Sequence, residues 1–197
     1  MKRGLSLLAL AAVAGTTFAQ NFNFDPGVPL QLFTLNSNDG YSAGRGIFFQ
    51  ATQNVVVQGG GFFNGFGTRQ DFTMTLWTAD SSGSNLRISN LGSFTIASPN
   101  VGDLYNDGLF AGNVNLTAGS YYHLEVSSNA SFDRNFFYNW NGPAVNIPPY
   151  FTIIDGSQGA NLSNTVAPAL RINVVPEPAT MLALGAGLAA LAARRRK

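Results

Sequence analysis

The sequence predicts an all-β protein built as an antiparallel two-sheet sandwich, and three observations support this fold class. Short segments of alternating apolar and polar residues recur about every ten residues. Clusters of Gly, Asn, Asp and Ser separate them, as in Asn38-Asp39-Gly40, and such clusters favour turns. The chain is rich in aromatic residues, with 16 Phe and 6 Tyr, and its central part shows no helical period.

The expected strands follow the alternating segments in chain order. They span residues 31–35, 47–51, 55–63, 72–78, 86–88, 93–97, 109–116, 121–127, 135–140, 151–154 and 169–174. Turns are expected at 80–83, 106–108, 118–119 and 155–156, and a polar loop at 155–167.

One strand already shows which side chains face the core. Residues two apart in a strand share a face of the sheet. In the strand 72–78, Phe72, Met74 and Leu76 form an apolar face, and Trp77 points to the opposite side among threonines. We therefore expect the first three side chains to be buried.

Two short segments resemble jelly-roll sandwiches of the carbohydrate-binding kind. Between Phe72 and Leu86, a strand with a Leu-Trp pair leads into a Ser-Gly turn. At 116–122, Leu-Thr-Ala-Gly-Ser-Tyr-Tyr is similar to the beginning of another strand in such domains. The resemblance implies a jelly-roll-like architecture and identifies no ligand.

The first residues have the parts of a secretory signal peptide. Lys2 and Arg3 form a basic start, an apolar stretch follows, and small residues precede an expected cleavage between Ala19 and Gln20. The sequence thus predicts a helical signal peptide at 1–19 and export of the rest of the chain.

The C-terminal segment 174–197 follows a central domain expected at 20–173 and has three unlike parts. These are Pro176, Glu177 and Pro178, then an uncharged run at 179–193, then Arg194, Arg195, Arg196 and Lys197. As a helix the run would be about 22 Å long, against about 30 Å for a bilayer's hydrocarbon core. We expect a short transmembrane helix at 179–193, with the four cations on the cytoplasmic side.

This tail resembles the PEP-CTERM sorting signal of bacterial exported proteins, which is also labelled an ice-binding-protein C-terminal domain. The residues that match are Val-Pro-Glu-Pro at 175–178, the Leu/Ala/Gly run and the basic end. In that family an exosortase, an integral membrane protease, recognises Pro-Glu-Pro and removes the tail, and exopolysaccharide production accompanies such proteins. The resemblance implies an exosortase partner, a transient anchor in the inner membrane, and delivery to the cell surface or extracellular matrix. A permanent C-terminal anchor is the alternative.

The charges of the central domain exclude one class of partner. Between Gln20 and Val175 the chain has five Arg, no Lys and nine acidic residues, a net charge of −4. Nucleic-acid binding needs clustered cations, so no nucleic-acid partner is expected. The chain has no Cys, which rules out disulfides and thiolate chemistry.

The only histidine, His123, offers little for catalysis. Tyr122, Leu124 and Val126 are expected to point inward, which would place His123 and Glu125 together on the solvent face of the same strand. The sequence contains no Gly-x-Ser-x-Gly elbow. We therefore expect an ordinary surface pair and no enzyme.

Calcium is the only ion that the sequence suggests, and no other cofactor is expected. Asn36, Asn38 and Asp39 place alternate oxygen atoms before a glycine, as in a truncated calcium loop without its bidentate Glu. A second oxygen cluster comprises Asp103, Asn106 and Asp107. Plain hydrogen bonding within turns is the alternative.

Trp77, Tyr138 and Trp140 are the candidate carbohydrate-binding residues. Sugar rings stack their C–H faces on aromatic rings, while Asn and Asp side chains bind the hydroxyls. The segment 136–143 contains both kinds of residue. The alternative is that these rings belong to the core.

The leading interpretation is an exported, non-catalytic protein of the cell surface or extracellular matrix, associated with exopolysaccharide. A carbohydrate-binding module is the alternative. A secreted glycoside hydrolase-like enzyme with two opposed carboxylates ranks third.

Overall fold

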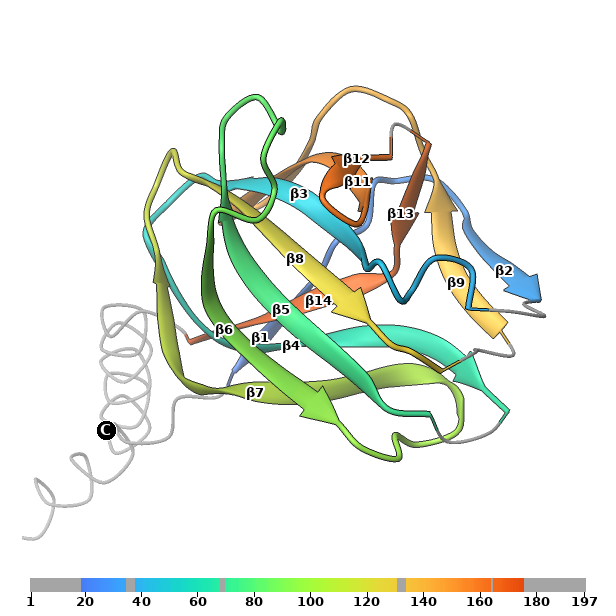
Figure 1. Ribbon diagram of the computed structural model, residues 1–197. Helices are drawn as coiled ribbons and strands as arrows, with labels where there is room; N and C mark the ends of the chain where they lie inside the picture. The colour runs from blue at the N-terminus through green and yellow to red at the C-terminus, as the bar shows by residue number, and fades with distance from the viewer. Residues whose placement is uncertain (1–18, 35–37, 68–69, 131–133, 164, 176–197) are drawn as a thin grey trace, which may run out of the picture. The chain divides into compact units, whose positions relative to one another are not determined.

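The computed structural model describes residues 19–34, 38–67, 70–130, 134–163 and 165–175. Every regular element among these residues is a β-strand (Figure 1), which confirms the all-β fold class. Within the described ranges there is no helix of the length and apolar character that crossing a membrane requires.

The chain divides into two units. Residues 21–174 form one compact unit, which contains the fold described below. The other comprises residues 1–20 and 175–197, of which only Ala19, Gln20 and Val175 are described. The expected transmembrane helix at 179–193 and all of the signal peptide except Ala19 lie outside the described residues.

The largest sheet has seven strands. Its order is β10 (Val145–Ile147), β11 (Phe151–Gln158), β3 (Arg45–Ala51), β8 (Tyr121–Ser127), β5 (Phe72–Ala79) and β6 (Ser89–Ile96), and β12 (Asn161–Leu162) also pairs with β11. All of these pairings are antiparallel. β8 lies between β3 and β5, so its side chains have neighbours on both sides.

A second sheet contains four strands. Its order is β1 (Gln20–Asn23), β14 (Leu170–Val175), β4 (Val55–Phe66) and β7 (Gly102–Leu116). β4 and β7 are long antiparallel partners whose register shifts between Val57 and Gly59. Such a bulge bends a strand and increases its twist, and both long strands curve beneath the large sheet in Figure 1.

A third sheet of three strands adds to the expected two-sheet sandwich. It consists of β13 (Val166–Pro168), β9 (Arg134–Asn139) and β2 (Leu30–Thr34), all antiparallel. β2 is one of the two edge strands of this sheet, and each of its residues is exposed. The polar-loop prediction missed β13, because so short a strand shows no clear alternation.

The core contains side chains of the two larger sheets. Those from the large sheet include Phe49, Leu76 and Leu124, and those from the second include Val57, Phe62 and Ile172. Phe62 of β4 meets Phe72 of β5 edge to face, with ring centroids 5.6 Å apart. The expected burial of Phe72, Met74 and Leu76 is confirmed. The two sheets thus form a sandwich.

Two predicted turns and one predicted strand are wrong. The turn at 106–108 lies inside β7, where Asp107 pairs with Gly61 of β4. The turn at 155–156 lies inside β11, which continues through a bulge between Ile153 and Asp155. In both places cross-strand pairing overrides a local turn preference. Residues 86–88 form no strand; the strand at 121–127 is confirmed with the expected bounds.

Candidate functional site

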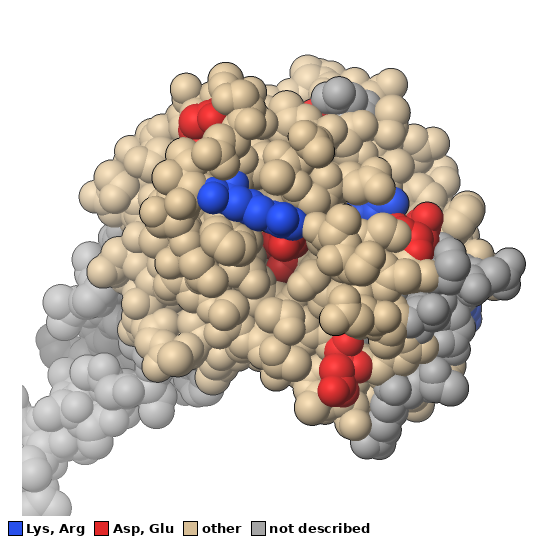
Figure 2. Space-filling view, viewed as in Figure 1, with Lys and Arg blue, Asp and Glu red and all other residues tan. Residues whose placement is uncertain are grey.

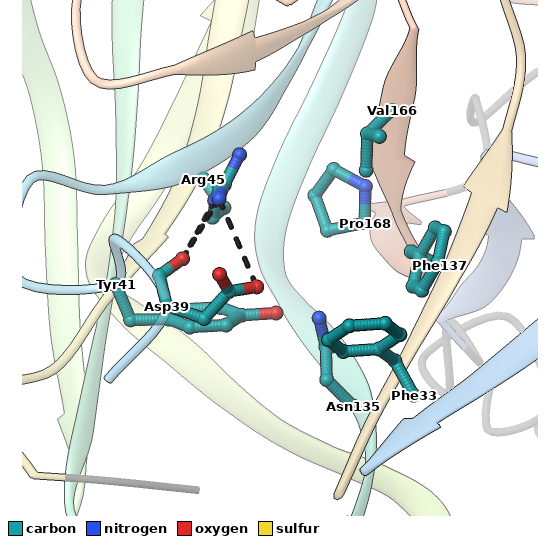
Figure 3. A pocket seen from close by; sticks show the side chains of 8 residues that line it. All are labelled: Phe33, Asp39, Tyr41, Arg45, Asn135, Phe137, Val166 and Pro168. Carbon is teal, nitrogen blue, oxygen red and sulfur yellow. Dashed lines mark hydrogen bonds and ion pairs between the residues drawn. The ribbon is translucent and has the colours of Figure 1, made fainter. Parts of the chain in front are cut away.

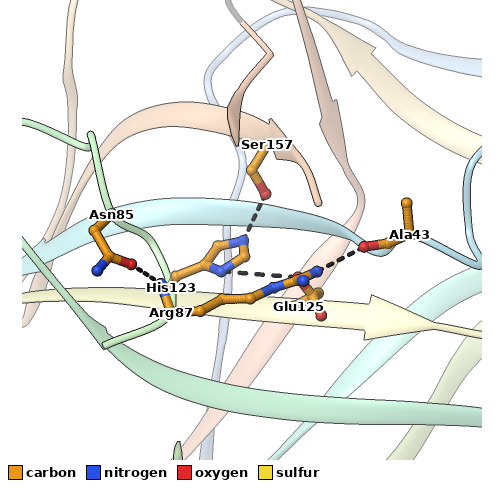
Figure 4. Close-up of polar contacts among 6 residues, drawn as sticks. All are labelled: Ala43, Asn85, Arg87, His123, Glu125 and Ser157. Carbon is orange, nitrogen blue, oxygen red and sulfur yellow. Dashed lines mark hydrogen bonds and ion pairs between the residues drawn. The ribbon is translucent and has the colours of Figure 1, made fainter. Parts of the chain in front are cut away.

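Four polar side chains from separate parts of the chain meet on one face of the large sheet (Figure 4). His123 and Glu125 lie on β8, Ser157 on β11, and Arg87 between β5 and β6. His123 Nε2 lies 2.5 Å from Ser157 Oγ. Arg87 donates to Glu125 Oε2 from Nε at 2.9 Å and from Nη2 at 2.5 Å. These four residues are called the polar cluster below.

Three residues of the polar cluster are buried, although the cluster lies on the face of β8 that points away from the core; the fourth, Arg87, has a side chain that is 32% exposed. The side chains of His123 and Ser157 are 0% exposed, and Glu125 is also buried. The expectation of a surface His123–Glu125 pair is therefore wrong. Alternation along a strand identifies a face, but it does not show what covers that face.

The segment 80–88 covers this face. Its turn is held by the Asp80 carboxylate, which accepts hydrogen bonds from the backbone N–H groups of Ser82 and Ser84 at 3.0 Å. Leu86 is fully buried, and Arg87 donates to the Ala43 carbonyl at 2.6 Å as well as to the cluster. Residues 86–88 were expected to form a strand. Instead, Leu86 packs in the interior and Arg87 binds Glu125.

A glycine makes room for the contact between His123 and Ser157. Gly46 on β3 pairs with β8 on one side and with β11 on the other. A Cβ at this position would lie 2.9 Å from Ser157 Oγ and 2.5 Å from the Leu124 carbonyl oxygen, and it would also overlap His123 Nε2. The residue at position 46 must therefore lack a side chain.

Burial controls the ionisation of the polar cluster. Loss of water lowers the pKa of His123 to about 3, and the positive charge of Arg87 acts in the same direction. Burial raises the pKa of Glu125, while hydrogen bonding and charge from Arg87 oppose this shift. The imidazole is therefore neutral at neutral pH.

The polar cluster contains the residue types of a Ser-His-acid triad, but its geometry differs from one. In a working triad the acid binds the imidazole N–H, and the nucleophile reaches substrate. Here His123 Nδ1 and Glu125 Oε2 are 3.9 Å apart, beyond hydrogen-bonding distance. Ser157 is buried, and an imidazole with a pKa of about 3 is a weak base. The arrangement suits a structural role, in which the side chains hold β8, β11 and the segment 80–88 together.

The second site is an open pocket of about 210 Å³ (Figure 3). Its lining residues come from β2, β3, β9, β13 and the turn before β3, and they are Phe33, Asp39, Tyr41, Arg45, Asn135, Phe137, Val166 and Pro168. This site is called the aromatic pocket below. It has an apolar side and a polar side, which Figure 3 shows facing one another.

Aromatic and aliphatic groups form the apolar side. The rings of Phe33 and Phe137 meet edge to face, with centroids 5.8 Å apart. They are brought together by the pairing of β2 with β9. Val166 and Pro168 of the neighbouring β13 continue this wall.

An ion pair forms most of the polar side. Arg45 donates to the Asp39 backbone carbonyl from Nε at 3.1 Å and from Nη2 at 2.8 Å. The Asp39 carboxylate lies 3.8 Å from the same guanidinium. The two formal charges cancel, so this side of the pocket is close to neutral.

Tyr41 and Asn135 are the buried polar residues of the pocket. Tyr41 is fully buried, and burial raises the pKa of its phenol, which stays protonated. Asn135 is 6% exposed, and its side chain shares a hydrogen bond with the Tyr41 phenol.

The calcium candidates at the turn before β3 are engaged in other contacts. Asn38 Nδ2 donates to the carbonyls of Ser128 and Ala130 at 2.8 and 2.5 Å, and its Oδ1 accepts from the Ser42 N–H. The Asp39 carboxylate faces an arginine, and Asn36 lies outside the described residues. No group of three or more His, Cys, Asp or Glu that could hold a metal occurs among the described residues. Calcium stays a prediction here, in competition with these hydrogen bonds.

The second oxygen cluster is not brought together. Asp103 forms an ion pair with Arg134 at 2.8 Å, and Asp107 forms one with Arg171. Asn106 lies between them on β7, so its side chain points to the opposite face, where it is buried.

The candidate carbohydrate-binding aromatics are also separated. Trp77 is half-buried on β5 of the large sheet. Tyr138 and Trp140 are 6% and 5% exposed and belong to the core, so neither offers an open ring face for stacking. Among the aromatic side chains that the structure describes, Phe33 is the exposed one, and its ring meets the partly buried Phe137. Sequence reasoning missed them because nothing local shows that β2 pairs with β9.

Charged side chains are sparse on the face shown in Figure 2. The two larger groups of Lys and Arg atoms there each lie beside Asp or Glu atoms. Of the sorting and cleavage residues, Ala19 and Gln20 are exposed, whereas Pro176–Pro178 and Arg194–Lys197 lie outside the described residues.

Comparison with solved structures finds only remote likeness. The VP2 subviral particle of infectious bursal disease virus matches at 14% identity over 82% of this chain and 35% of the viral chain, with a TM-score of 0.20. A mutant VP2 of the same virus, in T=1 particles, matches at 13% identity over 82% and 34%, with a TM-score of 0.22. This chain spans about a third of those viral chains. TM-scores this low do not show a shared fold or a shared function.

The C-terminal segment gives the informative comparison. The sequence matches no curated protein. Residues 174–197, however, match the family described as the PEP-CTERM protein-sorting motif, which confirms the resemblance inferred from the sequence. This motif implies transient membrane anchoring before release at the surface or outside the cell. The chain therefore carries a PEP-CTERM protein-sorting motif, the mark of an exported protein that an exosortase sorts.

Proposed function

We propose that this chain is a non-catalytic component of the cell surface or extracellular matrix that associates with exopolysaccharide. The observation that carries the proposal is the sorting motif at residues 174–197. The last strand, β14, ends at Val175, directly before Pro176. Removal of the tail near Pro-Glu-Pro would therefore leave the strands of the sandwich intact.

The geometry of the polar cluster and of the aromatic pocket supports a non-catalytic role. Glycoside hydrolysis needs a pair of carboxyl groups about 5 to 9.5 Å apart around the substrate. The aromatic pocket is lined by one carboxylate, Asp39, which faces Arg45. The polar cluster has a histidine and a serine, but both are buried and the imidazole is a weak base.

Tail processing tests the sorting half of the proposal. The full chain is expressed in its host with and without the exosortase, and the intact mass of the exported protein is measured. We expect a mass that lacks Arg194–Lys197 only when the protease is present. Changing Glu177→Ala together with Pro176→Ala should block the loss, whereas Leu32→Ala, on the exposed strand β2, should not. An exported chain that keeps the basic end contradicts the proposal.

Fractionation tests the matrix half. We expect the processed protein to sediment with the extracellular polysaccharide and to be released when the polysaccharide is digested. A processed protein that remains free in the medium at every polysaccharide concentration contradicts the association and leaves the sorting step intact.

A further inference from the structure

We propose that the aromatic pocket binds one neutral hexopyranose ring of a polysaccharide. This inference rests on the proposed function, because it names the ligand through which the domain would contact the matrix. The size, the two sides and the net charge of the pocket support it.

The volume of the pocket suits a single ring. Pockets for drug-sized ligands usually measure about 300–1,000 Å³, and this one has about 210 Å³. A sugar unit within a longer chain needs only a shallow, open site, since the neighbouring units remain in solvent.

The apolar side suits the C–H face of a pyranose. Phe33 is 49% exposed, although it is a large hydrophobic residue, and its ring meets Phe137 at the pocket wall. Aromatic rings pack against apolar faces with gains beyond simple area burial. A sugar ring on Phe33 would remove this apolar surface from water.

The polar side suits the hydroxyl edge of the same ring. Hydroxyls both donate and accept hydrogen bonds. The Asp39 carboxylate, which is 44% exposed, offers acceptor atoms, and Arg45 offers donor groups.

Charge selects among sugars. Because the Asp39 carboxylate and the Arg45 guanidinium face each other at 3.8 Å, a ligand meets no net charge on the polar side. A sugar carboxylate or phosphate would meet the Asp39 charge without a spare cation in the pocket lining. The pocket should therefore prefer a neutral hexose to a uronic acid.

The test uses the full chain purified in detergent, with methyl glycosides of glucose, galactose and mannose as probes. Binding is measured by titration calorimetry and by saturation-transfer NMR, which reports the ligand protons nearest the protein. We expect saturable millimolar binding of at least one hexoside, with the strongest transfer on ring C–H protons. No saturable binding of any of the three by folded protein overturns the proposal.

Phe33→Ala and Leu32→Ala form a matched pair of variants. Both residues are 49% exposed on β2, and adjacent strand positions point to opposite faces. Loss of the Phe33 ring should weaken hexoside binding about tenfold, the scale of one aromatic contact, and Leu32→Ala should leave it unchanged. Equal affinities of the two variants overturn the assignment of the pocket.

Asp39→Asn tests the charge argument. The backbone at Asp39 has a φ of 48°, which asparagine also adopts readily, so the turn should be kept. Removing the carboxylate leaves Arg45 without its counter-charge. Methyl glucuronide should then gain affinity relative to methyl glucoside by about threefold or more. An unchanged ratio between the two ligands contradicts the preference for neutral sugars.

The failure of this inference can be told from failure of the proposed function. If the Phe33→Ala protein sediments with the matrix as the unaltered protein does, the pocket is not the contact and the surface role stands. If the tail is kept on the exported chain, the surface role fails whatever the hexoside titrations show.

Discussion

The polar cluster and the aromatic pocket use the same kind of ion pair in opposite ways. In the polar cluster, Arg87 binds Glu125 through two short hydrogen bonds, and the carboxylate is 7% exposed. In the aromatic pocket, Arg45 lies 3.8 Å from a carboxylate that is 44% exposed. Segment 80–88 supplies Arg87, which closes over the Glu125 carboxylate, whereas the second pair lines an open pocket. Burial, more than residue type, thus separates a structural pair from one that is available to a ligand.

The largest effect of a single substitution that this comparison predicts is at Gly46, beside the polar cluster. Gly46→Ala would force its Cβ against the Leu124 carbonyl, Ser157 and His123. Overpacking of this kind should lower the free energy of unfolding by about 3 kcal/mol, measured by urea denaturation. Gly112→Ala is the matched control, since a Cβ there meets nothing within 4 Å, and it should change stability by about 0.5 kcal/mol or less. Similar losses of unfolding free energy in both variants would mean that the space beside Gly46 can hold a methyl group.

The ion pair of the polar cluster should give the next largest effect. Glu125→Gln should cost about 2 kcal/mol, less than for a fully buried pair because the Arg87 side chain is 32% exposed. Asp103→Asn is the control, since its pair with Arg134 is well exposed on both sides, and it should cost under about 1 kcal/mol. Equal losses, measured by thermal and urea unfolding, would contradict the distinction by burial.

Acid should weaken the fold through His123. Its pKa is about 3 in the folded chain and 6.5 as the ordinary value, so between these values the unfolded chain binds the extra proton. Stability is then complete above about pH 6.5 and falls as the pH falls toward 3, by up to about 1.4 kcal/mol per pH unit. The raised pKa of Glu125 acts in the opposite sense and reduces the slope.

Urea midpoints between pH 7 and pH 4 measure this dependence, with His123→Gln as the comparison. The variant lacks the imidazole, so its stability should fall less on acidification than that of the unaltered chain. A slope that is the same in both proteins would show that other groups control the acid response.

The smallest effect on the free energy of unfolding is expected in the aromatic pocket. Phe33→Ala should change the free energy of unfolding by less than about 1 kcal/mol, because half of the ring is already in water. The same variant should lose hexoside binding. If Phe33→Ala unfolds the protein as readily as Gly46→Ala does, the aromatic pocket is part of the core and the two regions do not differ.

Much of the fold follows from local patterns in the sequence. Alternation along 121–127 placed Tyr122, Leu124 and Val126 in the core, and all three are buried. A strand of this kind shows its period within a few residues, so no distant information is needed. The turn at 106–108 failed for the opposite reason, since pairing of β7 with β4 outweighs the local preference.

The sequence alone determined the all-β class, most of the strands and the sorting motif at 174–197, because each is encoded by residues that are adjacent in the chain. Tertiary structure decided which polar residues are covered and which are open. Ser157 reaches His123 from 34 residues away along the chain, and Arg87 reaches Glu125 from 38 residues away. Phe33 reaches Phe137 through strand pairing. Alternation reveals the face that a side chain occupies, but only the packing of distant segments decides whether water reaches that face.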